Sequence, residues 1–391
     1  MSEGAYDVVV VGLGGMGSAT LAHVAKRGRR VLGIERFARG HEFGASSGRS
    51  RIIRKAYFED PAYVPLLVRA YELWRELERE TGATLLDLRG LLVVGDAGGR
   101  VVRGILASAD EHGLAIDRLD RADVLARYPS LLVERDECGL FERDAGSIDP
   151  EASVDAHLNV AEAAGAVARF STRVAGIASR PDGIAVALDD GTTVLAARLA
   201  VCAGPWTSDV LPDLALPIRL QRNVQVWFRP TVDAYAAGRF PAFLVDRPAR
   251  WPAPLYGFAD AGHGVKAAFH GFGETTSADG LERGVSAGDV AAVADALETW
   301  MPGAAGELIA SKACTYALTP DEHFAIDVLP GDDRIAIAGG FSGHGFKFCS
   351  VVGEIVADLA LEGGTRHAIG FLRLARLLEA GPSPLPFAPS S

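Results

Sequence analysis

A glycine-rich turn between two short apolar runs constrains this chain more than any other feature of its sequence. The turn follows the apolar run 6–11 with the spacing G-x-G-x-x-G, which is formed by Gly12, Gly14 and Gly17. A helix is expected over 18–27, and a second apolar run at 31–34 ends on Glu35. This order predicts a β-α-β unit whose first strand is parallel and buried, as in a Rossmann-like domain.

Each glycine of the turn has its own physical reason. Gly12 permits the tight turn, Gly14 lets the backbone approach a pyrophosphate, and Gly17 lets the helix pack closely on the strand. The phosphates would lie at the amino end of the helix, and Glu35 is placed to accept hydrogen bonds from the adenosine ribose. The motif therefore predicts a bound dinucleotide, but it does not decide between FAD and NAD.

Length and charge narrow the class of protein further. With 391 residues, two closely built domains are expected, and 49% apolar against 23% charged residues is the balance of a globular protein. The net charge is -11 and no basic run is dense, so nucleic acid is not expected as a partner. There is no run of ~18 apolar residues and no basic leader before the first strand, so we expect a cytoplasmic protein without a membrane partner.

The four cysteines are too few and too irregularly spaced for a disulfide framework or a zinc site, and no metal is expected. They are Cys138, Cys202, Cys314 and Cys349. Each is interpreted by default as a buried, reduced thiol.

The order of apolar patterns predicts a discontinuous fold. Helices are expected over 60–80, 101–112, 121–128, 148–164 and 289–300, and strands over 90–94, 168–177, 184–188, 197–202, 224–228 and 265–270. The segment 230–255 is expected to be irregular, and the Pro-rich tail 382–391 to be frayed. The fold class is thus α/β with an α+β second domain. The Rossmann-like domain would comprise 1–81, 148–216 and 321–391, and a mixed-sheet substrate domain 82–147 and 217–320.

Three blocks, in this order, carry a resemblance to a known family. Residues 50–57 read Ser-Arg-Ile-Ile-Arg-Lys-Ala-Tyr, and Cys-Thr-Tyr at 314–316 precedes Thr-Pro-Asp-Glu-His-Phe at 319–324 and Ile-Asp at 326–327. Residues 340–348 read Gly-Phe-Ser-Gly-His-Gly-Phe-Lys-Phe. Over nearly its whole length the chain resembles the monomeric sarcosine oxidases and N-methyltryptophan oxidases of the D-amino acid oxidase superfamily. The resemblance implies FAD as the cofactor.

The resemblance also assigns cofactor contacts. Cys314 would form a thioether to a methyl carbon on the benzenoid ring of the flavin, which requires a thiolate beside an electron-poor ring; a buried, inert thiol is the alternative. The glycine-rich run would lie with its backbone against the flavin, because glycine permits close approach. We expect the cofactor-binding residues of this run to be Gly340, Phe341, Gly343, Gly345 and Lys347. Further cofactor contacts are expected from Arg36, Ser50, Arg51, Val174 and Gly204.

Substrate contacts follow from the same matches. Arg54 and Lys347 correspond to the pair that holds the substrate carboxylate, since a guanidinium binds two oxygens at once and an ammonium adds a point charge. Arg51 would lie near the flavin, where its charge favours the reduced, anionic form. Tyr256 and His270 would line the substrate cavity; the alternatives are a core aromatic residue and a hydrogen-bonded core histidine.

Lysine usage is an independent clue, because only five lysines occur among 39 basic residues. Two of them, Lys266 and Lys347, fall on family site positions. By resemblance Lys266 would hold a water against the flavin and stabilise superoxide as oxygen takes its first electron. The alternative is a strand lysine that reaches for solvent.

One position departs from the family pattern. Ser47 stands where the family often carries an active-site histidine, and a hydroxyl cannot supply the same charge or titrate near neutrality. This leaves the identity of the amine open. Trp227 would either shape the cavity or belong to the core.

The expected activity is FAD-dependent oxidation of a small secondary amino acid, sarcosine or another N-methyl amino acid. The amine would lose a hydride equivalent to give an imine that water hydrolyses, and O2 would leave as H2O2. Sarcosine would yield glycine and formaldehyde. The alternatives are a cyclic or primary amino acid (pipecolate, proline, glycine), N-methyltryptophan, or an NAD-dependent dehydrogenase, and the protein is expected to be a monomer.

Overall fold

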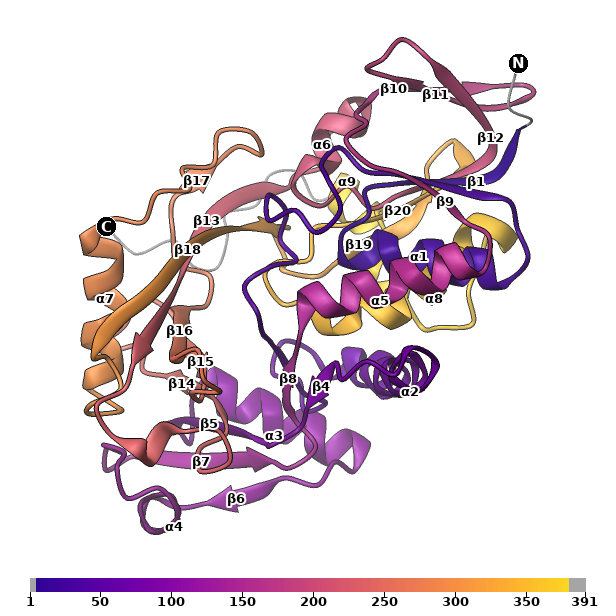
Figure 1. The fold of residues 1–391 in the computed structure, drawn as a ribbon. Coiled ribbons are helices and arrows are strands. Elements are labelled where there is room, and N and C mark those ends of the chain that lie inside the picture. The colour runs from indigo at the N-terminus through magenta and orange to yellow at the C-terminus, as the bar shows by residue number, and fades with distance from the viewer. Residues whose placement is uncertain (1–4, 380–391) are drawn as a thin grey trace.

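The architecture was described from a computed structural model, which describes residues 5–379. The expected frayed tail, 382–391, lies outside these residues. The chain forms two large sheets, with a small three-stranded sheet between them (Figure 1). The expected class, α/β with a mixed-sheet second part, is confirmed.

The first sheet is built around β1 (Tyr6–Val11) and contains eight strands within the described residues. β1 pairs in parallel with β2 (Val31–Ile34) on one side and β12 (Thr193–Val201) on the other. The other strands are β9 (Val167–Arg169), β10 (Val174–Arg180), β11 (Gly183–Leu188), β19 (Ala325–Leu329) and β20 (Asp332–Gly339). Because β20 pairs in parallel with β12, this sheet joins segments from both ends of the chain.

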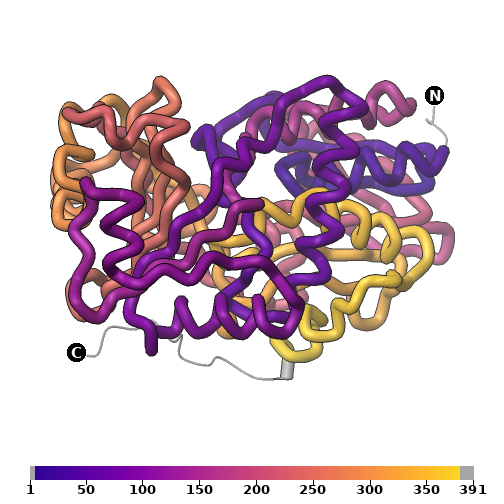
Figure 2. The backbone as a smooth tube through the Cα atoms, turned by 90° about the horizontal axis from the view of Figure 1, so that it is seen from below, coloured from indigo at the N-terminus to yellow at the C-terminus, as the bar shows by residue number. Residues whose placement is uncertain are grey.

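Three helices cover one face of the first sheet. They are α1 (Gly15–Lys26), α5 (Pro150–Ala163) and α8 (Cys349–Glu362). α1 contacts both of the others, and Figure 2 shows α8, in yellow, beside α1, in indigo. α8 is buried around its whole circumference from Cys349 to Ala360. Its one polar stripe, Ser350, Glu354 and Asp358, is buried because it is hydrogen-bonded to Ala70, Arg69 and Arg27.

The second sheet is mixed and contains nine strands within the described residues. They are β5 (Leu91–Asp96), β6 (Asp117–Leu119), β7 (Glu137–Glu142), β13 (Arg219–Arg229), β14 (Ala242–Asp246), β15 (Leu255–Phe258), β16 (Val265–Phe269), β17 (Thr275–Thr276) and β18 (Glu307–Leu318). β14 and β5 pair in parallel, and the other pairs are antiparallel. Helices α3 (Arg100–His112), α4 (Arg121–Arg127) and α7 (Ala287–Glu298) belong to this part of the chain.

The small sheet lies where the chain passes between the two large ones. It consists of β3 (Arg51–Ile53), β8 (Gly146–Ile148) and β4 (Leu86–Asp87), and helix α2 (Val64–Thr81) lies beside it in Figure 1. Short helices α6 (Thr207–Val210) and α9 (Ala375–Glu379) complete the set of α-helices in the described residues. All strands of the second sheet come from 91–142 and 219–318, and we propose domains with the boundaries expected above.

Two expectations about the elements were wrong. The segment 168–177 is not one strand, because Ser171 and Thr172 donate their backbone N–H to Phe37 and Glu35, and Ser171 has a φ of +53°. The chain therefore leaves the ladder beside β2 and re-enters the sheet beside β11. The segment 230–255 is not irregular throughout, since β14 forms within it and joins β5 to β15.

No helix in the described part of the chain combines the length and apolar character needed to cross a bilayer.

Candidate active site

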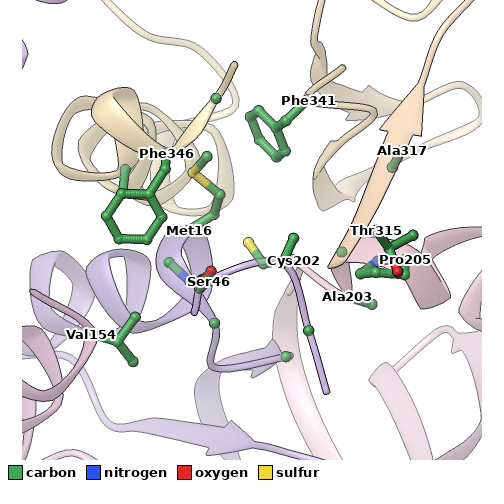
Figure 3. A pocket seen from close by; sticks show the side chains of 18 of the residues that line it. Met16, Ser46, Val154, Cys202, Ala203, Pro205, Thr315, Ala317, Phe341 and Phe346 are labelled. Atoms are coloured by element: carbon green, nitrogen blue, oxygen red, sulfur yellow. Dashed lines mark hydrogen bonds between the residues drawn. The ribbon is translucent and has the colours of Figure 1, made fainter. Parts of the chain in front are cut away.

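One elongated cavity of about 290 Å³ lies where the two large sheets meet. It is lined by the turn after β1, by residues of β15 and β18, and by the loop that follows β20. Figure 3 shows Met16, Ser46 and Cys202 around the same space as Phe341 and Phe346 of the C-terminal loop. The cavity therefore brings together the blocks that stood far apart in the sequence.

The glycines of the turn are explained by close packing. A Cβ on Gly17 would lie 1.7 Å from the Gly12 carbonyl oxygen, and one on Gly12, at φ +86°, would lie 2.5 Å from that of Cys202. A Cβ on Gly14 would meet only Ser46 Oγ, at 3.6 Å, so this glycine leaves the cavity wall open. Gly12 and Gly14 line the cavity, whereas Gly17 lies behind them.

Glu35 supports the turn from the end of β2. Its carboxylate accepts hydrogen bonds from the backbone N–H of Leu13 at 2.8 Å and of Phe37 at 3.0 Å. Burial opposes the charge, but hydrogen bonds from His41 and from these two N–H groups hold the pKa of Glu35 below its usual value. An ionised carboxylate is thus fixed at the cavity wall.

The three other residues expected around the adenosine end also line the cavity. Arg36 forms an ion pair with Asp279, at 2.7 Å, and stacks on Trp206. Val174 and Gly204 lie on the same wall, and Gly204 adopts a φ of +55° that favours glycine.

Cys314 lies on β18, lines the cavity and is 3% exposed. Its Sγ accepts a hydrogen bond from Gln225 Nε2 at 3.4 Å. Burial raises the pKa of the thiol, whereas the charges of Arg51 and Lys266 lower it. Two further cysteines, Cys202 and Cys349, line the cavity, but they lie at the glycine turn against Gly12 and Gly15.

The loop after β20 needs its glycines to pack against β18. A Cβ on Gly343 would lie 2.2 Å from the Tyr316 ring, and one on Gly345 would lie 2.6 Å from Phe341. Gly340 is held at φ +60° with Thr319 beside it. These glycines and Phe341 line the cavity as expected.

Arg54 lines the cavity and is 4% exposed. Its Nη2 lies 2.7 Å from both carboxylate oxygens of Glu59, and its Nη1 donates to the Ala56 carbonyl at 2.8 Å. Burial raises the pKa of Glu59, but the charges of Arg54, His344 and Lys347 together with the hydrogen bond from Arg54 outweigh it, and the pKa falls to about 2. The guanidinium therefore already holds an internal carboxylate beside the cavity.

Lys347 lies near Arg54 and is 5% exposed. Its Nζ donates to the His344 carbonyl at 2.7 Å and contacts the Tyr57 hydroxyl at 3.5 Å. Burial and the charge of Arg54 lower the pKa of Lys347 to about 7, with Glu59 opposing them. The lysine can therefore change its charge near neutral pH.

Tyr256 and His270 line the same cavity. His270 Nδ1 lies 3.4 Å from the hydroxyl of Tyr316, and its ring packs edge-on against Tyr256. Burial lowers the pKa of His270 to about 4, so this imidazole is neutral at physiological pH. Burial likewise raises the pKa of Tyr256, which keeps the phenol protonated.

Three of the expected site residues, Gly17, Ser50 and Lys266, do not line this cavity. Arg51 does, but Ser50 and Lys266 lie directly behind it. Lys266 is 2% exposed, and its Nζ donates to the carbonyls of Gly48 at 2.7 Å and Ser50 at 2.8 Å. Burial and the charge of Arg51 lower the pKa of Lys266 well below its usual value.

The two residues that the sequence left open are also placed. Ser47 is buried, and its hydroxyl oxygen has no hydrogen-bond partner. Trp227 is buried on β13, outside the large cavity, and its ring lies 5.2 Å from Lys266 Nζ.

Sequence reasoning missed several residues of the site. Glu59 carried no motif, although an acid five residues after Arg54 was a signal for pairing. Gln225 gave no signal, because only the pairing of β13 with β18 brings it to Cys314. Tyr316 and His344 lay inside the matched blocks without an assigned role, and both line the cavity. Within the described residues no group of three or more His, Cys, Asp or Glu side chains is arranged to hold a metal ion.

Comparison with known proteins agrees with this geometry. The chain is 41% identical over 381 residues to the monomeric sarcosine oxidase of Streptomyces avermitilis, covering 96% of this chain and 98% of that protein. It is 34% identical to N-methyl-L-tryptophan oxidase of Escherichia coli (strain K12 / DH10B), covering 95% and 99%. The structure is similar to that of NikD, described as an unusual amino acid oxidase essential for nikkomycin biosynthesis, with a TM-score of 0.83, 26% identity and 94% and 97% of the two chains covered. The family model described as FAD dependent oxidoreductase (DAO) matches residues 7–359, and the chain belongs to this family.

Proposed function

We propose that this FAD-dependent oxidoreductase oxidises a small secondary amino acid, sarcosine or another N-methyl amino acid, to an imine that water hydrolyses to an amine and an aldehyde. O2 is the acceptor and leaves as H2O2. The observation that carries the proposal is the pair of buried cations, Arg54 and Lys347, which line the same cavity as the dinucleotide turn and lie 4.2 and 5.1 Å from the centre of the Tyr57 ring. A carboxylate bound between them would place the rest of the amino acid toward Cys314 and the glycine-rich loop.

The residues present fit FAD. Gly14 leaves the wall open at the helix amino end, where a pyrophosphate binds, and the buried Gln225 Oε1 lacks a hydrogen-bond partner beside Cys314. Glu35 would hold the ribose, and Gly340, Gly343 and Gly345 the ring. When bound, the flavin accepts a hydride equivalent from the amine and passes two electrons on to O2.

A thioether to Cys314 is part of the proposal: the sulfur would replace one hydrogen of a ring methyl group, the S–H and C–H protons would be released, and the two electrons would pass to O2, giving H2O2. Cys314 is the cavity cysteine that does not pack against the glycines of the turn, and the charges of Arg51 and Lys266 partly offset the burial that raises the pKa of its thiol. Gln225 Nε2 adds a hydrogen bond to the same sulfur atom. Attachment at this position would anchor the ring between β18 and the loop after β20.

Substrate binding assigns a task to each residue near Arg54 and Lys347. The carboxylate would bind Arg54 and protonated Lys347, which supply charge-assisted hydrogen bonds of about 1.5–3 kcal/mol each. Tyr256 and His270 are neutral and line the space beside them, so they shape the cavity without attracting a second charge. Their rings exclude water from the carbon that is oxidised.

The relatives support the choice of substrate class. Proteins named monomeric sarcosine oxidase and N-methyl-L-tryptophan oxidase are 41% and 34% identical to this chain over nearly their full length. We propose sarcosine-like amino acids first and N-methyltryptophan second. The glycine oxidase of Geobacillus kaustophilus, at 21% identity, shows the fold alone. Monomeric state and cytoplasmic location are proposed with the activity.

A panel of amines with peroxide detection tests this function. We expect sarcosine to give H2O2 and formaldehyde in equal amounts, and an amine of the same size without a carboxylate to react poorly. Oxidation of proline or glycine in preference to every N-methyl amino acid would reject the substrate class. Reduction of the flavin by sarcosine without oxygen consumption would reject O2 as the acceptor.

A further inference from the structure

The sequence block 319–324 holds none of the residues proposed above to bind FAD or the amino acid. It forms the turn after β18, where the Glu322 N–H donates to the Thr319 carbonyl at 3.2 Å and Glu322 has a φ of +62°. An L residue seldom adopts this conformation, and such backbone strain is concentrated at functional sites. The Glu322 carbonyl oxygen lies 3.0 Å from Nε2 of His344, which lines the cavity. The turn therefore reaches the site through a backbone carbonyl group.

The surroundings of His344 decide which of its ring nitrogens carries the proton. Burial lowers the pKa of His344 to about 3, so the imidazole is neutral and has one N–H. A carbonyl oxygen can only accept, so the contact with Glu322 requires the proton on Nε2. Nδ1 is then an acceptor, and the Tyr57 hydroxyl, 2.6 Å away, donates to it. Burial and the charge of Glu59 raise the pKa of Tyr57 well above its usual value, so this hydroxyl keeps its proton.

Tyr57 carries this hydrogen-bond direction on to Lys347. Because the hydroxyl proton is directed at His344, the Tyr57 oxygen presents lone pairs to Lys347 Nζ, 3.5 Å away. In the opposite tautomer Nδ1 would donate to the Tyr57 oxygen. The hydroxyl proton would then compete with the ammonium for the His344 carbonyl oxygen, which lies 3.3 Å from the hydroxyl and 2.7 Å from Nζ. Since an ammonium group can only donate, the Nε2–H tautomer is the one that favours it.

This arrangement leaves Lys347 with one N–H for a ligand. Of the three donors of the ammonium group, one is directed at the His344 carbonyl and one at the Tyr57 hydroxyl. Among residues 5–379 no acceptor is found for the third, and Lys347 lines the cavity. The ring of Tyr57 also lies against the guanidinium of Arg54. Tyr57 therefore contacts both of the cations proposed to bind the carboxylate.

We propose that Tyr57 and His344 are positioning residues that direct the Lys347 ammonium at the substrate carboxylate, with the Glu322 carbonyl fixing the tautomer of His344. The inference deepens the proposed function and rests on it, because the carboxylate site belongs to that proposal. Both residues act through Lys347 rather than on the bond that is oxidised.

The same contact affects the charge of Lys347, whose pKa is about 7 because of burial and the charge of Arg54. A hydrogen bond accepted by the Tyr57 hydroxyl favours the protonated amine, so its loss would lower the pKa of Lys347 further. Other charged or titratable groups face Lys347 from the segment after β3, the residue after β16, the loop before α8 and the start of α8; they are Arg54, Glu59, His270, His344 and Cys349. Removal of one hydroxyl leaves these groups in place. Binding that needs the charged lysine should then be lost at a lower pH.

The test uses the flavin-loaded enzyme and methoxyacetate, an analogue of sarcosine without a titrating amine. Tyr57→Phe removes the hydroxyl and keeps the ring against both cations. Tyr71→Phe is the matched control, because Tyr71 is also a buried tyrosine but its hydroxyl donates to the Asp144 carbonyl at 2.9 Å. The dissociation constant of methoxyacetate is measured from the flavin absorbance across neutral pH. Tyr57→Phe is measured both alone and combined with Lys347→Met.

We expect Tyr57→Phe to bind methoxyacetate about tenfold more weakly near neutral pH, and to lose binding about one pH unit lower than the wild type. Tyr71→Phe should bind as the wild type does. In the Lys347→Met background Tyr57→Phe should have no further effect, because the hydroxyl acts through the lysine. Weaker binding in both backgrounds with an unchanged pH midpoint would show a merely structural role of Tyr57 and overturn the proposal.

A second measurement does not depend on ligand binding. The nitrogen NMR shifts of labelled histidine report the tautomer, and the signal of His344 is assigned by comparison with His344→Phe and His344→Asn. We expect the proton on Nε2, and a proton on Nδ1 would overturn the proposal. Wild-type binding by Tyr57→Phe, with binding by Lys347→Met impaired, rejects this inference alone. Wild-type binding by Lys347→Met rejects the carboxylate site of the proposed function, and the inference with it.

Discussion

The buried pair of Arg54 and Glu59 makes a sharp prediction for Arg54→Met. In the structure both carboxylate oxygens of Glu59 lie 2.7 Å from Arg54 Nη2, and the two side chains are 5% and 8% exposed. Removing one partner of a buried ion pair usually costs about 3–5 kcal/mol, because the other charge is left without compensation. The free energy of unfolding of Arg54→Met should therefore be about 3–5 kcal/mol lower than that of the wild type at neutral pH.

The pH dependence of this loss has a definite sign. The pKa of Glu59 lies near 2 in the folded protein, so the pair stabilises the fold above about pH 4.5, and this stabilisation is lost as the pH falls toward 2. Without Arg54, burial raises the pKa of Glu59, and protonation relieves the variant as the pH falls. Its deficit relative to the wild type should shrink in acid.

Glu59→Gln separates the structural effect from the loss of substrate binding. The double variant Arg54→Met/Glu59→Gln removes the uncompensated charge of Glu59. Urea denaturation should show that it recovers most of the free energy of unfolding lost in Arg54→Met. Its KM for sarcosine should still rise about tenfold to hundredfold, since a charge-assisted bond of about 1.5–3 kcal/mol remains absent. Wild-type stability of the single variant Arg54→Met would refute this reasoning. So would an equal rise in KM for an amine that lacks a carboxylate.

Three further predictions concern single residues. Flavin should remain with the polypeptide after acid denaturation of the wild type and of Cys202→Ser, but be absent or released from Cys314→Ser; yellow supernatant from the wild type would reject the thioether. Lys266→Met should slow reoxidation by O2 about a hundredfold and change anaerobic reduction far less, because the charge is needed when oxygen gains an electron; equal rates in rapid mixing would return Lys266 to a structural role. Methoxyacetate, which mimics sarcosine without a titrating amine, should bind more weakly as the pH rises through about 7, since Lys347 loses its proton there. Titration of Lys347→Met should show no such change, and a flat profile for the wild type would exclude Lys347 from carboxylate binding.

The parts of the fold that local sequence could predict are those set by local chemistry. The strand 6–11, the glycine turn and Glu35 follow one another within a single β-α-β unit, and the structure has them as expected. Helix α1 begins at Gly15 rather than at residue 18, because the last residues of the glycine motif are already helical. The break between β9 and β10 could not be read from apolar periodicity, since it depends on hydrogen bonds from Ser171 and Thr172 to the segment after β2.

Site residues inside the family motifs could be predicted from the sequence. Residues that reach the site only through packing of distant segments could not. Arg54, Lys347, Tyr256 and His270 all line one cavity, although more than 290 positions separate the first two. Glu59 and Gln225 reach their partners only through the folded chain. Lys266 is expected to hold a water against the flavin, and this role stays a prediction. Its hydrogen bonds to residues 48–50 could not be predicted from any local pattern.

The parallel pairing of β20 with β12 has a consequence for biosynthesis. The sheet that carries the glycine turn is completed by the strand at 332–339, and the loop at 340–347 closes the cavity after it. The dinucleotide turn emerges from the ribosome first, yet its binding site is unfinished until almost the whole chain has been translated. Flavin capture would then be a late event in maturation. Chains stalled on the ribosome with residue 318 as the last one released should retain no FAD, and tight retention by such chains would show that capture begins earlier.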